Sequence, residues 1–410
     1  MSSVLAPITK EVLVWARKAA LRTEEELAQV ADVSVERYRE WESGVSFPTL
    51  RQIERIANKV KRPCIVFFMP QEPSEPKPLL DYRTVGNRSK GSFSADLVLD
   101  IRRARYLQSR LEEDWEDVFP EWTSNLPAFQ INDDPVVRAD EVRASLGVTL
   151  AQQKKFKLEN RGLREWRHAL FLSGVLTFGF RVEREQALGF AIWHSRFPLV
   201  GFNLDGYKSQ QVFTLFHELA HLCLRQSVVS DLGADRLQSG RDAVKRTETF
   251  CNGFASALLL PPGAKEVQDA VADISKEGAT DAGLVDKYAK KFRVSKYVLL
   301  HRLIESGKVP KSKSTAVFSA WRKIDEEESE LREAKQKARE EKNKLLGKER
   351  KGASPVADSL SARGETLTRR VLQAMSSGTL EFSDAQDLLG LRDYQFEALE
   401  LELSRRKVVD

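Results

Sequence analysis

The sequence predicts a multidomain, mainly α protein with one α+β domain. Residues 8–62 have the pattern of four short helices, and residues 175–203 hold three short β candidates followed by an apolar helix. Apolar side chains at helical spacing also mark the chain after residue 353. A chain of 410 residues can form two or three domains, each with its own core. We therefore expect a helix-turn-helix bundle over 1–65, a linker over 66–93, an α+β domain with a small sheet over 94–310, a charged helical connector over 311–352 and a small helical module over 353–410.

The composition sets few limits on function. A net charge of +5 is mildly basic for this length, so it permits nucleic-acid contact without requiring it. The three cysteines are scattered: Cys64, Cys223 and Cys251. They suggest neither a disulfide framework nor a paired-cysteine metal site, and point to a reducing cytosol. We expect Cys223 and Cys251 to be small buried thiols. Lys10 and Glu11 interrupt the start of the chain, and the longest apolar stretch, 169–180, is too short to cross a bilayer. We expect a cytoplasmic protein without a membrane partner.

The first domain is predicted from its helix starts. We expect helices over 9–20, 23–30, 34–41 and 49–60. Thr23 and Glu26 form a capping box, whereas Ser34 starts its helix with Arg37 at the corresponding position and forms none. The second and third helices are joined by a three-residue turn, which fits a helix-turn-helix of the Xre type with 34–41 as the recognition helix.

The recognition helix leaves two uses of this domain open. Three of its side chains are candidates for facing DNA, with phosphates as their surest targets: Arg37, Tyr38 and Arg39. Three nearby carboxylates weaken this interpretation because they repel a phosphate backbone: Glu36, Glu40 and Glu42. The domain therefore either binds DNA or serves as an adaptor for another protein.

The chain between the first domain and the sheet is less informative. Residues 63–78 are rich in proline and acidic residues, which predicts an extended linker. A long helix is expected over 94–117, and a solvated or salt-bridged face explains its arginines better than nucleic-acid contact. Three short strands are expected over 175–182, 188–193 and 199–203.

The most informative run lies at residues 213–221 and reads F-T-L-F-H-E-L-A-H. In a helix, His217 and His221 share one face about 6 Å apart, so both can bind one tetrahedral Zn²⁺. Glu218 lies beside the metal and can take a proton from a water molecule that the metal has made acidic. The pattern is typical of zinc peptidases, and two core histidines are the alternative.

A third ligand is expected downstream. Glu248 is the best candidate, because it opens an apolar helix that ends at two prolines. Asn252 lies one turn later, where it can accept a hydrogen bond from the far nitrogen of a ligating histidine and so orient the ring. Four other carboxylates compete with Glu248 for the metal: Asp231, Asp235, Asp242 and Glu266. The ligand set favours Zn²⁺ by affinity and is compatible with Mn²⁺.

These motifs resemble the ImmA/IrrE metallopeptidases, in which H-E-x-x-H is followed by E-x-x-x-N-x-F-A-x-x-L-L-x-P. From residue 248 this chain reads E-T-F-C-N-G-F-A-S-A-L-L-L-P. The likeness extends over roughly residues 8–310 and includes G-F-A at 189–191, F-P-L-V at 197–200, Asn203, W-E-S-G at 41–44 and Y-R at 82–83. It implies a zincin-like peptidase domain of the gluzincin type over 94–310, with Glu248 as third metal ligand.

The resemblance also implies a function. Members of this family cleave helix-turn-helix repressors, so the chain is expected to be a zinc endopeptidase that derepresses mobile-element or stress genes. One alternative is a DNA-binding regulator whose zinc domain is a sensor or partner-binding surface without turnover. Another is the protease component of a toxin or defence system. The oligomeric state, the activating signal and the cleaved bond are not encoded in any recognisable pattern.

Smaller expectations concern the rest of the chain. Candidate donors to the carbonyl oxygen of a substrate are His194, Tyr207 and Tyr297. His301 is expected to pack rather than to act. Residues 318–350 are expected to form one solvated helix with charge pairs at i, i+4 spacing. The helical module after it has no predicted partner.

Overall fold

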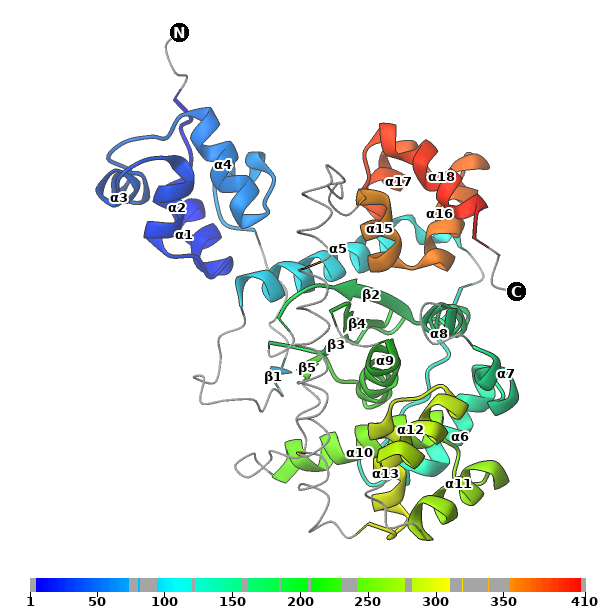
Figure 1. Ribbon diagram of the computed structural model, residues 1–410. Helices are drawn as coiled ribbons and strands as arrows, with labels where there is room; N and C mark the ends of the chain where they lie inside the picture. The colour runs from blue at the N-terminus through cyan, green and yellow to red at the C-terminus, as the bar shows by residue number, and fades with distance from the viewer. Residues whose placement is uncertain are drawn as a thin grey trace. The chain divides into compact units, whose positions relative to one another are not determined.

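A computed structural model describes residues 5–73, 80–81, 94–119, 122–156, 161–183, 186–205, 208–230, 242–276, 282–309 and 354–406, with the single positions 319 and 338 (Figure 1). The chain divides into two compact units. The first consists of Met1–Leu79 with Ser89–Arg103, and the second of Leu80–Arg88 with Ala104–Asp410. The domain boundaries expected from the sequence stay a proposal. No described helix combines the length and the apolar character needed to span a bilayer.

The first unit is a small helical bundle, as predicted. Its helices are α1 (Lys10–Ala19), α2 (Glu24–Ala31), α3 (Val35–Ser43), α4 (Leu50–Val60) and the 3₁₀ helix η1 (Cys64–Phe68). Thr23 and Glu26 form the predicted capping box, and Thr49 with Gln52 forms a second one. Each such cap stabilises its helix by about 1 kcal/mol, because it satisfies backbone N–H groups that lack a helical partner.

The expected linker starts later than the sequence suggested. Residues 64–68 are not extended but form η1, whose Phe67 is fully buried in the core of the first unit. The backbone N–H of Thr9 donates to Phe67 O at 2.9 Å, which ties η1 to the start of α1. Apolar burial of Phe67 thus overrides the proline and acidic composition around it. The long helix α5 (Ala95–Val118) matches its prediction, with its residues up to Arg103 in the first unit and the remainder in the second.

A five-stranded mixed sheet lies at the centre of the second unit. Its strands are β1 (Leu80–Asp81), β2 (Leu176–Phe180), β3 (Gly189–Ile192), β4 (Leu199–Asn203) and β5 (Val228–Ser230). They lie in the order β1-β5-β3-β4-β2. β2 runs parallel to β4, β3 is antiparallel to β4 and β5, and β1 is parallel to β5. The three predicted strands are confirmed, whereas β1 and β5 are too short to be recognised in the sequence.

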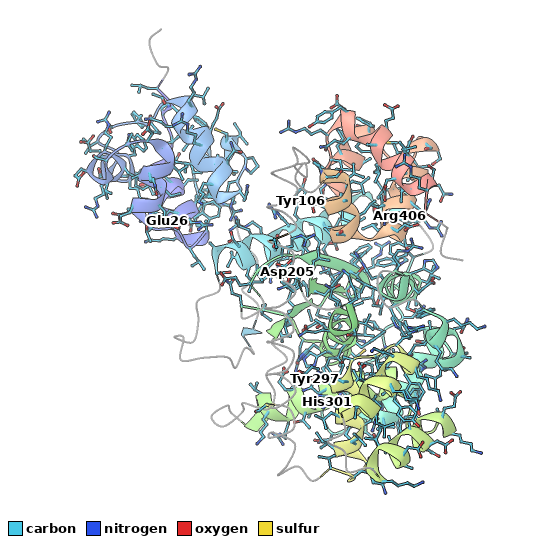
Figure 2. The ribbon with its side chains drawn as sticks, in the orientation of Figure 1. Glu26, Tyr106, Asp205, Tyr297, His301 and Arg406 are labelled. Carbon is cyan, nitrogen blue, oxygen red and sulfur yellow. The ribbon has the colours of Figure 1, made fainter. Side chains whose placement is uncertain are left out.

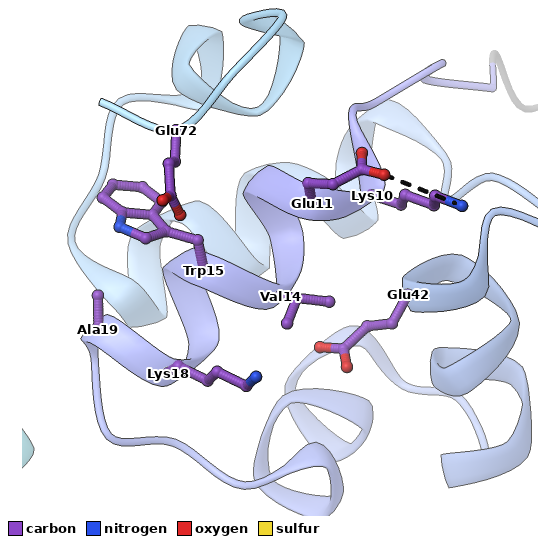
Figure 3. Close-up of a pocket in the computed structure, with 8 residues that line it drawn as sticks. All are labelled: Lys10, Glu11, Val14, Trp15, Lys18, Ala19, Glu42 and Glu72. Atoms are coloured by element: carbon purple, nitrogen blue, oxygen red, sulfur yellow. Dashed lines mark ion pairs between the residues drawn. The ribbon is translucent and has the colours of Figure 1, made fainter. Parts of the chain in front are cut away.

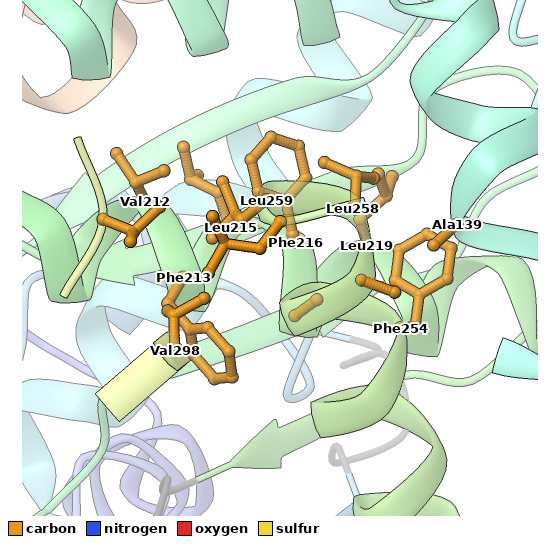
Figure 4. Packing of buried hydrophobic residues seen from close by; sticks show 14 of the residues in the cluster. Ala139, Val212, Phe213, Leu215, Phe216, Leu219, Phe254, Leu258, Leu259 and Val298 are labelled. Atoms are coloured by element: carbon orange, nitrogen blue, oxygen red, sulfur yellow. The ribbon is translucent and has the colours of Figure 1, made fainter. Parts of the chain in front are cut away.

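Helices surround this sheet and bury the metal-motif helix. They are α6 (Pro135–Ser145), α7 (Leu150–Lys155), α8 (Arg161–Leu172), α9 (Lys208–Cys223), α10 (Asp242–Leu259), α11 (Lys265–Lys276), α12 (Ala282–Phe292) and α13 (Lys296–Glu305). α9 packs on β3 and β4 on one side and on α10 on the other. Phe216, Leu219 and Phe254 belong to the apolar cluster that joins them (Figure 4). Because α9 is enclosed from Gln211 to Cys223, its polar side chains must find partners inside the protein.

The C-terminal module is helical, as predicted. It contains α15 (Pro355–Arg363), α16 (Glu365–Ser376), α17 (Phe382–Leu389), the 3₁₀ helix η3 (Asp393–Gln395) and α18 (Phe396–Ser404). α15 packs against β2, and α16 packs against α8. Arg167 of α8 donates to the carbonyl oxygens of Ser361 and Ala362 at 2.8 and 3.0 Å. The module is thereby fixed to the peptidase-like core. The charged connector expected over 318–350 lies outside the described residues.

Candidate metal centre

α9 places the two histidines of the motif inside the protein and on one face. The side chains of His217, Glu218 and His221 are all fully buried. The ring centroids of His217 and His221 are 5.1 Å apart, and their Nε2 atoms are 3.3 Å apart. Burial of α9 between sheet and α10 therefore fixes both rings with their Nε2 atoms facing one another.

Both rings are oriented by a partner on the opposite nitrogen. His217 Nδ1 lies 3.0 Å from Asn252 Oδ1, and His221 Nδ1 lies 3.0 Å from Gln226 Oε1. An amide oxygen only accepts, so each Nδ1 carries a proton. In both rings Nε2 is then the nitrogen that can bind a metal ion. The Gln226 contact could not be predicted from the sequence, because it depends on the turn that ends α9.

Glu248 of α10 completes the group. Its Oε2 lies 3.2 Å from His217 Nε2 and its Oε1 lies 3.3 Å from His221 Nε2. Ligand atoms at the corners of a tetrahedron with bonds of 2.0–2.1 Å would be about 3.3–3.4 Å apart. The three side chains are the set of metal-ligating groups that the described residues bring together, within 4.8 Å of one another. Their donor types and spacing therefore fit Zn²⁺.

Glu248 is ionised in this environment. Burial favours its protonated form, but the nearby His217 and His221 favour the carboxylate and hold the pKa of Glu248 down at about 2. Among its competitors, Glu266 lies away from the group, in an ion pair of 2.7 Å with Lys154. Asp231, Asp235 and the side chain of Asp242 fall outside what the structure describes.

The side chain of Glu218 lies against the start of β3. Gly189, the first residue of β3, comes so close that a Cβ atom there would be 2.6 Å from Glu218 Oε1 and 2.6 Å from Thr214 Cγ2. Glycine at this position lets the strand approach the helix and confines the carboxylate. The G-F-A run was noticed in the sequence, but its closeness to Glu218 was not predicted.

The candidate donors to a substrate oxygen differ in their surroundings. His194 Nδ1 accepts from the backbone N–H groups of Arg196 and Phe197 at 3.2 and 3.1 Å, which explains it as a loop-stabilising residue. Tyr207 lies outside the described residues. Tyr297 and His301 lie one turn apart on α13, and Figure 2 shows the two side chains close together. The ring of His301 stacks on Phe213, one turn before His217, so its position next to the metal centre was missed in the sequence.

Two cysteines lie near the group. Cys223 and Cys251 are both fully buried. Burial raises the pKa of Cys251 to about 11, although the neighbouring His221 opposes this shift. A protonated thiol is a poor metal ligand, so the expectation of buried structural thiols agrees with their environment.

Not all of the candidate DNA-binding residues of the helix-turn-helix domain lie at the surface. Tyr38 is fully buried, with its ring 5.9 Å from that of Trp41, so its assignment as a DNA contact was wrong. Its aromatic ring contributes more to the core of the small bundle than it could to a phosphate contact. Arg37 pairs with Glu40, and Arg39 lies 2.6 Å from Glu24.

A shallow pocket of the first unit is lined largely by α1, including Val14 and Trp15 (Figure 3). Lys10 and Glu11 of its lining pair with each other at 3.9 Å. Charged groups that already pair select no particular ligand, so we assign this pocket no role.

The match to a known family model indicates a metallopeptidase-type domain, and the candidate metal centre lies within it. Residues 173–304 match the family model of the IrrE N-terminal-like domain, and this span includes His217, Glu218, His221 and Glu248. Residues 13–63 match the family model of a helix-turn-helix domain of the Xre type, a DNA-binding class. The chain is therefore similar to an IrrE N-terminal-like peptidase domain over 173–304 and to a helix-turn-helix domain over 13–63, an arrangement that supports an ImmA/IrrE-like regulator protease. A search of curated proteins found no match.

Proposed function

We propose that this protein is a zinc-dependent endopeptidase in a regulatory circuit, and that its substrate is a helix-turn-helix transcriptional repressor. The observation that carries the proposal is the mutual spacing of the Nε2 atoms of His217 and His221 and the carboxylate of Glu248, which lie 3.2–3.3 Å apart. Burial of two Nε2 atoms opposite a carboxylate costs free energy unless a cation lies among them.

The roles of the side chains follow from their positions. A bound zinc ion would polarise a peptide carbonyl and lower the pKa of a water molecule. His217, His221 and Glu248 would hold it, with Asn252 and Gln226 orienting the rings. Glu218 takes a proton from the water as it attacks the carbonyl carbon, and gives a proton to the leaving nitrogen as the C–N bond breaks. Gly189 keeps the carboxylate of Glu218 in place for both transfers.

The substrate class rests on the domain architecture. A DNA-binding class of domain and a peptidase domain on one chain suit a protein that acts on gene regulators. Removal of a repressor by cleavage would switch on the genes that it controls. DNA is a second possible partner through the helix-turn-helix domain, although Arg37 and Arg39 already pair with carboxylates.

The test is to express the chain with the helix-turn-helix protein encoded beside it and to measure the intact mass of that neighbour. The wild type is compared with Glu218→Gln at matched zinc content. Cleavage by the wild type that is absent in the variant supports the proposal and identifies the bond. An intact neighbour with both zinc-loaded forms contradicts it.

The helix-turn-helix match also favours a second candidate, a transcription regulator whose zinc domain does not turn over. In that case Glu218→Gln leaves regulation of the target genes unchanged, whereas Arg37→Ala with Arg39→Ala abolishes it. The peptidase proposal expects the opposite ranking, so a reporter gene read in both variants separates the two.

A further inference from the structure

His301 lies at one end of a row of neighbouring rings that includes the candidate ligands His217 and His221. Its ring stacks on Phe213, with 5.9 Å between centroids and 9° between planes. Phe213 is followed along the same face of α9 by His217 at 6.3 Å, and His217 by His221 at 5.1 Å. A third imidazole, from a different helix, thus lies at the His217 end of the ligand pair.

The position of His301 is fixed by the same helices that fix the ligands. Ser295 caps α13 by accepting from the N–H of Val298, and Val298, Leu299 and Leu303 are fully buried. α13 packs against α10, which carries Glu248. Ser256 Oγ of α10 donates to Glu305 of α13 at 3.2 Å. The ring therefore needs little reorganisation to act on a substrate.

His301 is neutral in these surroundings. Burial, and then the charges of His217 and Arg302, lower the pKa of His301 to about 4. A divalent cation nearby would act in the same direction. A neutral imidazole carries one N–H group and does not repel a metal ion. Its side chain also keeps part of its surface exposed, unlike the fully buried His217 and His221.

The contacts of the other imidazoles near the centre define their roles. The Nδ1 atoms of His217 and His221 face Asn252 and Gln226, and their Nε2 atoms face Glu248. His194 accepts backbone N–H groups in its loop. Tyr297, one turn before His301 on α13, is the described alternative donor (Figure 2).

We propose that His301 donates a hydrogen bond to the carbonyl oxygen of the peptide bond that is cleaved. When water adds to the carbonyl carbon, the π electron pair of the C=O bond moves to this oxygen, and its negative charge is stabilised by the imidazole N–H. As the C–N bond breaks, the electron pair on this oxygen re-forms the C=O bond, and the C–N bonding pair leaves with the nitrogen, which takes a proton from Glu218. This role rests on the proposed peptidase function and makes His301 a further catalytic residue.

The experiment compares three full-length variants with the wild type, all loaded with zinc. His301→Phe keeps an aromatic ring against Phe213 and removes the N–H. His301→Gln restores a donor, and Tyr297→Phe removes the alternative hydroxyl on the same helix face. Zinc content and melting temperature are measured first, because a purely structural role would change these.

The rate of cleavage is then measured on the repressor identified with the wild type, under single-turnover conditions. We expect His301→Phe to lower the rate about 100- to 1000-fold at similar substrate affinity, His301→Gln to recover part of it, and Tyr297→Phe to stay close to wild type. Equal rates in His301→Phe and wild type, or a loss confined to Tyr297→Phe, overturn the assignment while the peptidase function stands. A wild type that does not cleave refutes the proposed function itself.

Binding gives a readout that does not depend on turnover. The phosphoryl group of N-phosphoryl-leucyl-tryptophan is tetrahedral, like the carbon atom after water has added to the carbonyl, whereas acetohydroxamate is planar. Calorimetry on the zinc-loaded protein is expected to show about 10- to 100-fold weaker binding of the phosphoryl dipeptide to His301→Phe and unchanged binding of acetohydroxamate. Equal affinities of both forms for the phosphoryl dipeptide contradict the assignment. If the wild type does not bind it, the cleavage rates alone decide.

Discussion

Gly189 and Glu218 are in such close contact that only a hydrogen can occupy the side-chain position of residue 189. A Cβ atom there would lie 2.6 Å from Glu218 Oε1 and 2.8 Å from its Cγ, closer than non-bonded atoms allow. Neither side has room to yield, because Glu218 is fully buried and Thr214, the other neighbour, is 2% exposed. The backbone at the start of β3 therefore limits where the carboxylate of Glu218, the candidate general base, can lie.

Gly189→Ala is expected to slow peptide cleavage without removing the metal. The added methyl group displaces the carboxylate of Glu218 by a fraction of an ångström, and misplacement of a reacting group by about 1 Å can cost about 100-fold in rate. We expect a loss of about 10- to 100-fold, measured as the single-turnover rate on the repressor substrate. Gly263→Ala is the matched control, since its Cβ would meet no atom within 4 Å. Normal activity in Gly189→Ala would contradict the role assigned to this contact.

Glu248→Gln is expected to weaken zinc binding by at least about 100-fold. The amide keeps the size of the side chain but removes the negative charge that offsets the cation, and its nitrogen is not a ligand. Competition with a chromophoric chelator measures the affinity. Glu266→Gln removes a carboxylate that pairs with Lys154 instead and should bind zinc like the wild type. Equal affinities of the two variants would count against Glu248 as third ligand.

Asn252→Leu tests the support of His217. Loss of the amide oxygen leaves His217 Nδ1 without its 3.0 Å partner, so the ring can rotate or change tautomer. Zinc affinity is expected to fall about 10- to 100-fold with little change in helical content by circular dichroism. Gln268→Leu is a control, because the side chain of Gln268 donates to Pro262 O on an exposed turn. An unchanged zinc affinity in Asn252→Leu would show that packing alone orients the ring.

The predictable part of this protein is the part encoded by local patterns. Helix starts carry their own signals, so Thr23 and Ser34 marked α2 and α3 to within a residue. The i, i+4 spacing likewise placed His217 and His221 on one face of α9. Local signals fail where a side chain can serve two environments. In the sequence Tyr38 stands between two arginines, which predicts an exposed side chain. In the structure its ring is buried in the core of the bundle.

The remaining features depend on contacts between distant segments. β5 has three residues and is a strand because β3 and β1, on either side of it, offer it backbone partners. Gln226 reaches His221 only through the turn after α9. The packing of α13 places the ring of His301 on Phe213, one turn before His217, and no spacing in the sequence encodes this. Tertiary packing, rather than pattern, creates these parts of the site.

Arg167→Met is expected to destabilise the second unit and loosen its C-terminal module. Arg167 is buried, and besides the two carbonyl oxygens of α15 its Nε donates to Thr177 Oγ1 at 2.8 Å. Burial lowers the pKa of Arg167 to about 9, so the cation persists at neutral pH. Methionine fills the space but leaves these acceptors unsatisfied, at a cost of about 2–4 kcal/mol in the free energy of unfolding.

Hydrogen exchange of α15 and the urea midpoint measure the effect of Arg167→Met. Arg181→Met is the control, because Arg181 is exposed and its pairs with Asp205 at 3.2 Å and with Asp358 of α15 at 3.7 Å should together contribute less than about 1 kcal/mol. Equal midpoints in the two variants would show that the guanidinium group does not secure the module.

The low pKa of His301 predicts a dependence of stability on pH. In the unfolded chain the pKa of a histidine is about 6.5, whereas in the folded protein that of His301 is about 4. Between these values the unfolded state binds more protons, so this contribution to stability is complete above about pH 6.5 and is lost as the pH falls towards 4. From pH 7 to pH 5 the loss amounts to about 2 kcal/mol. Urea unfolding of metal-free wild type and His301→Phe at both pH values isolates this contribution, because every other titratable group is common to the two proteins. The variant should lose about 2 kcal/mol less than the wild type, and parallel losses would mean that His301 is solvated and titrates normally.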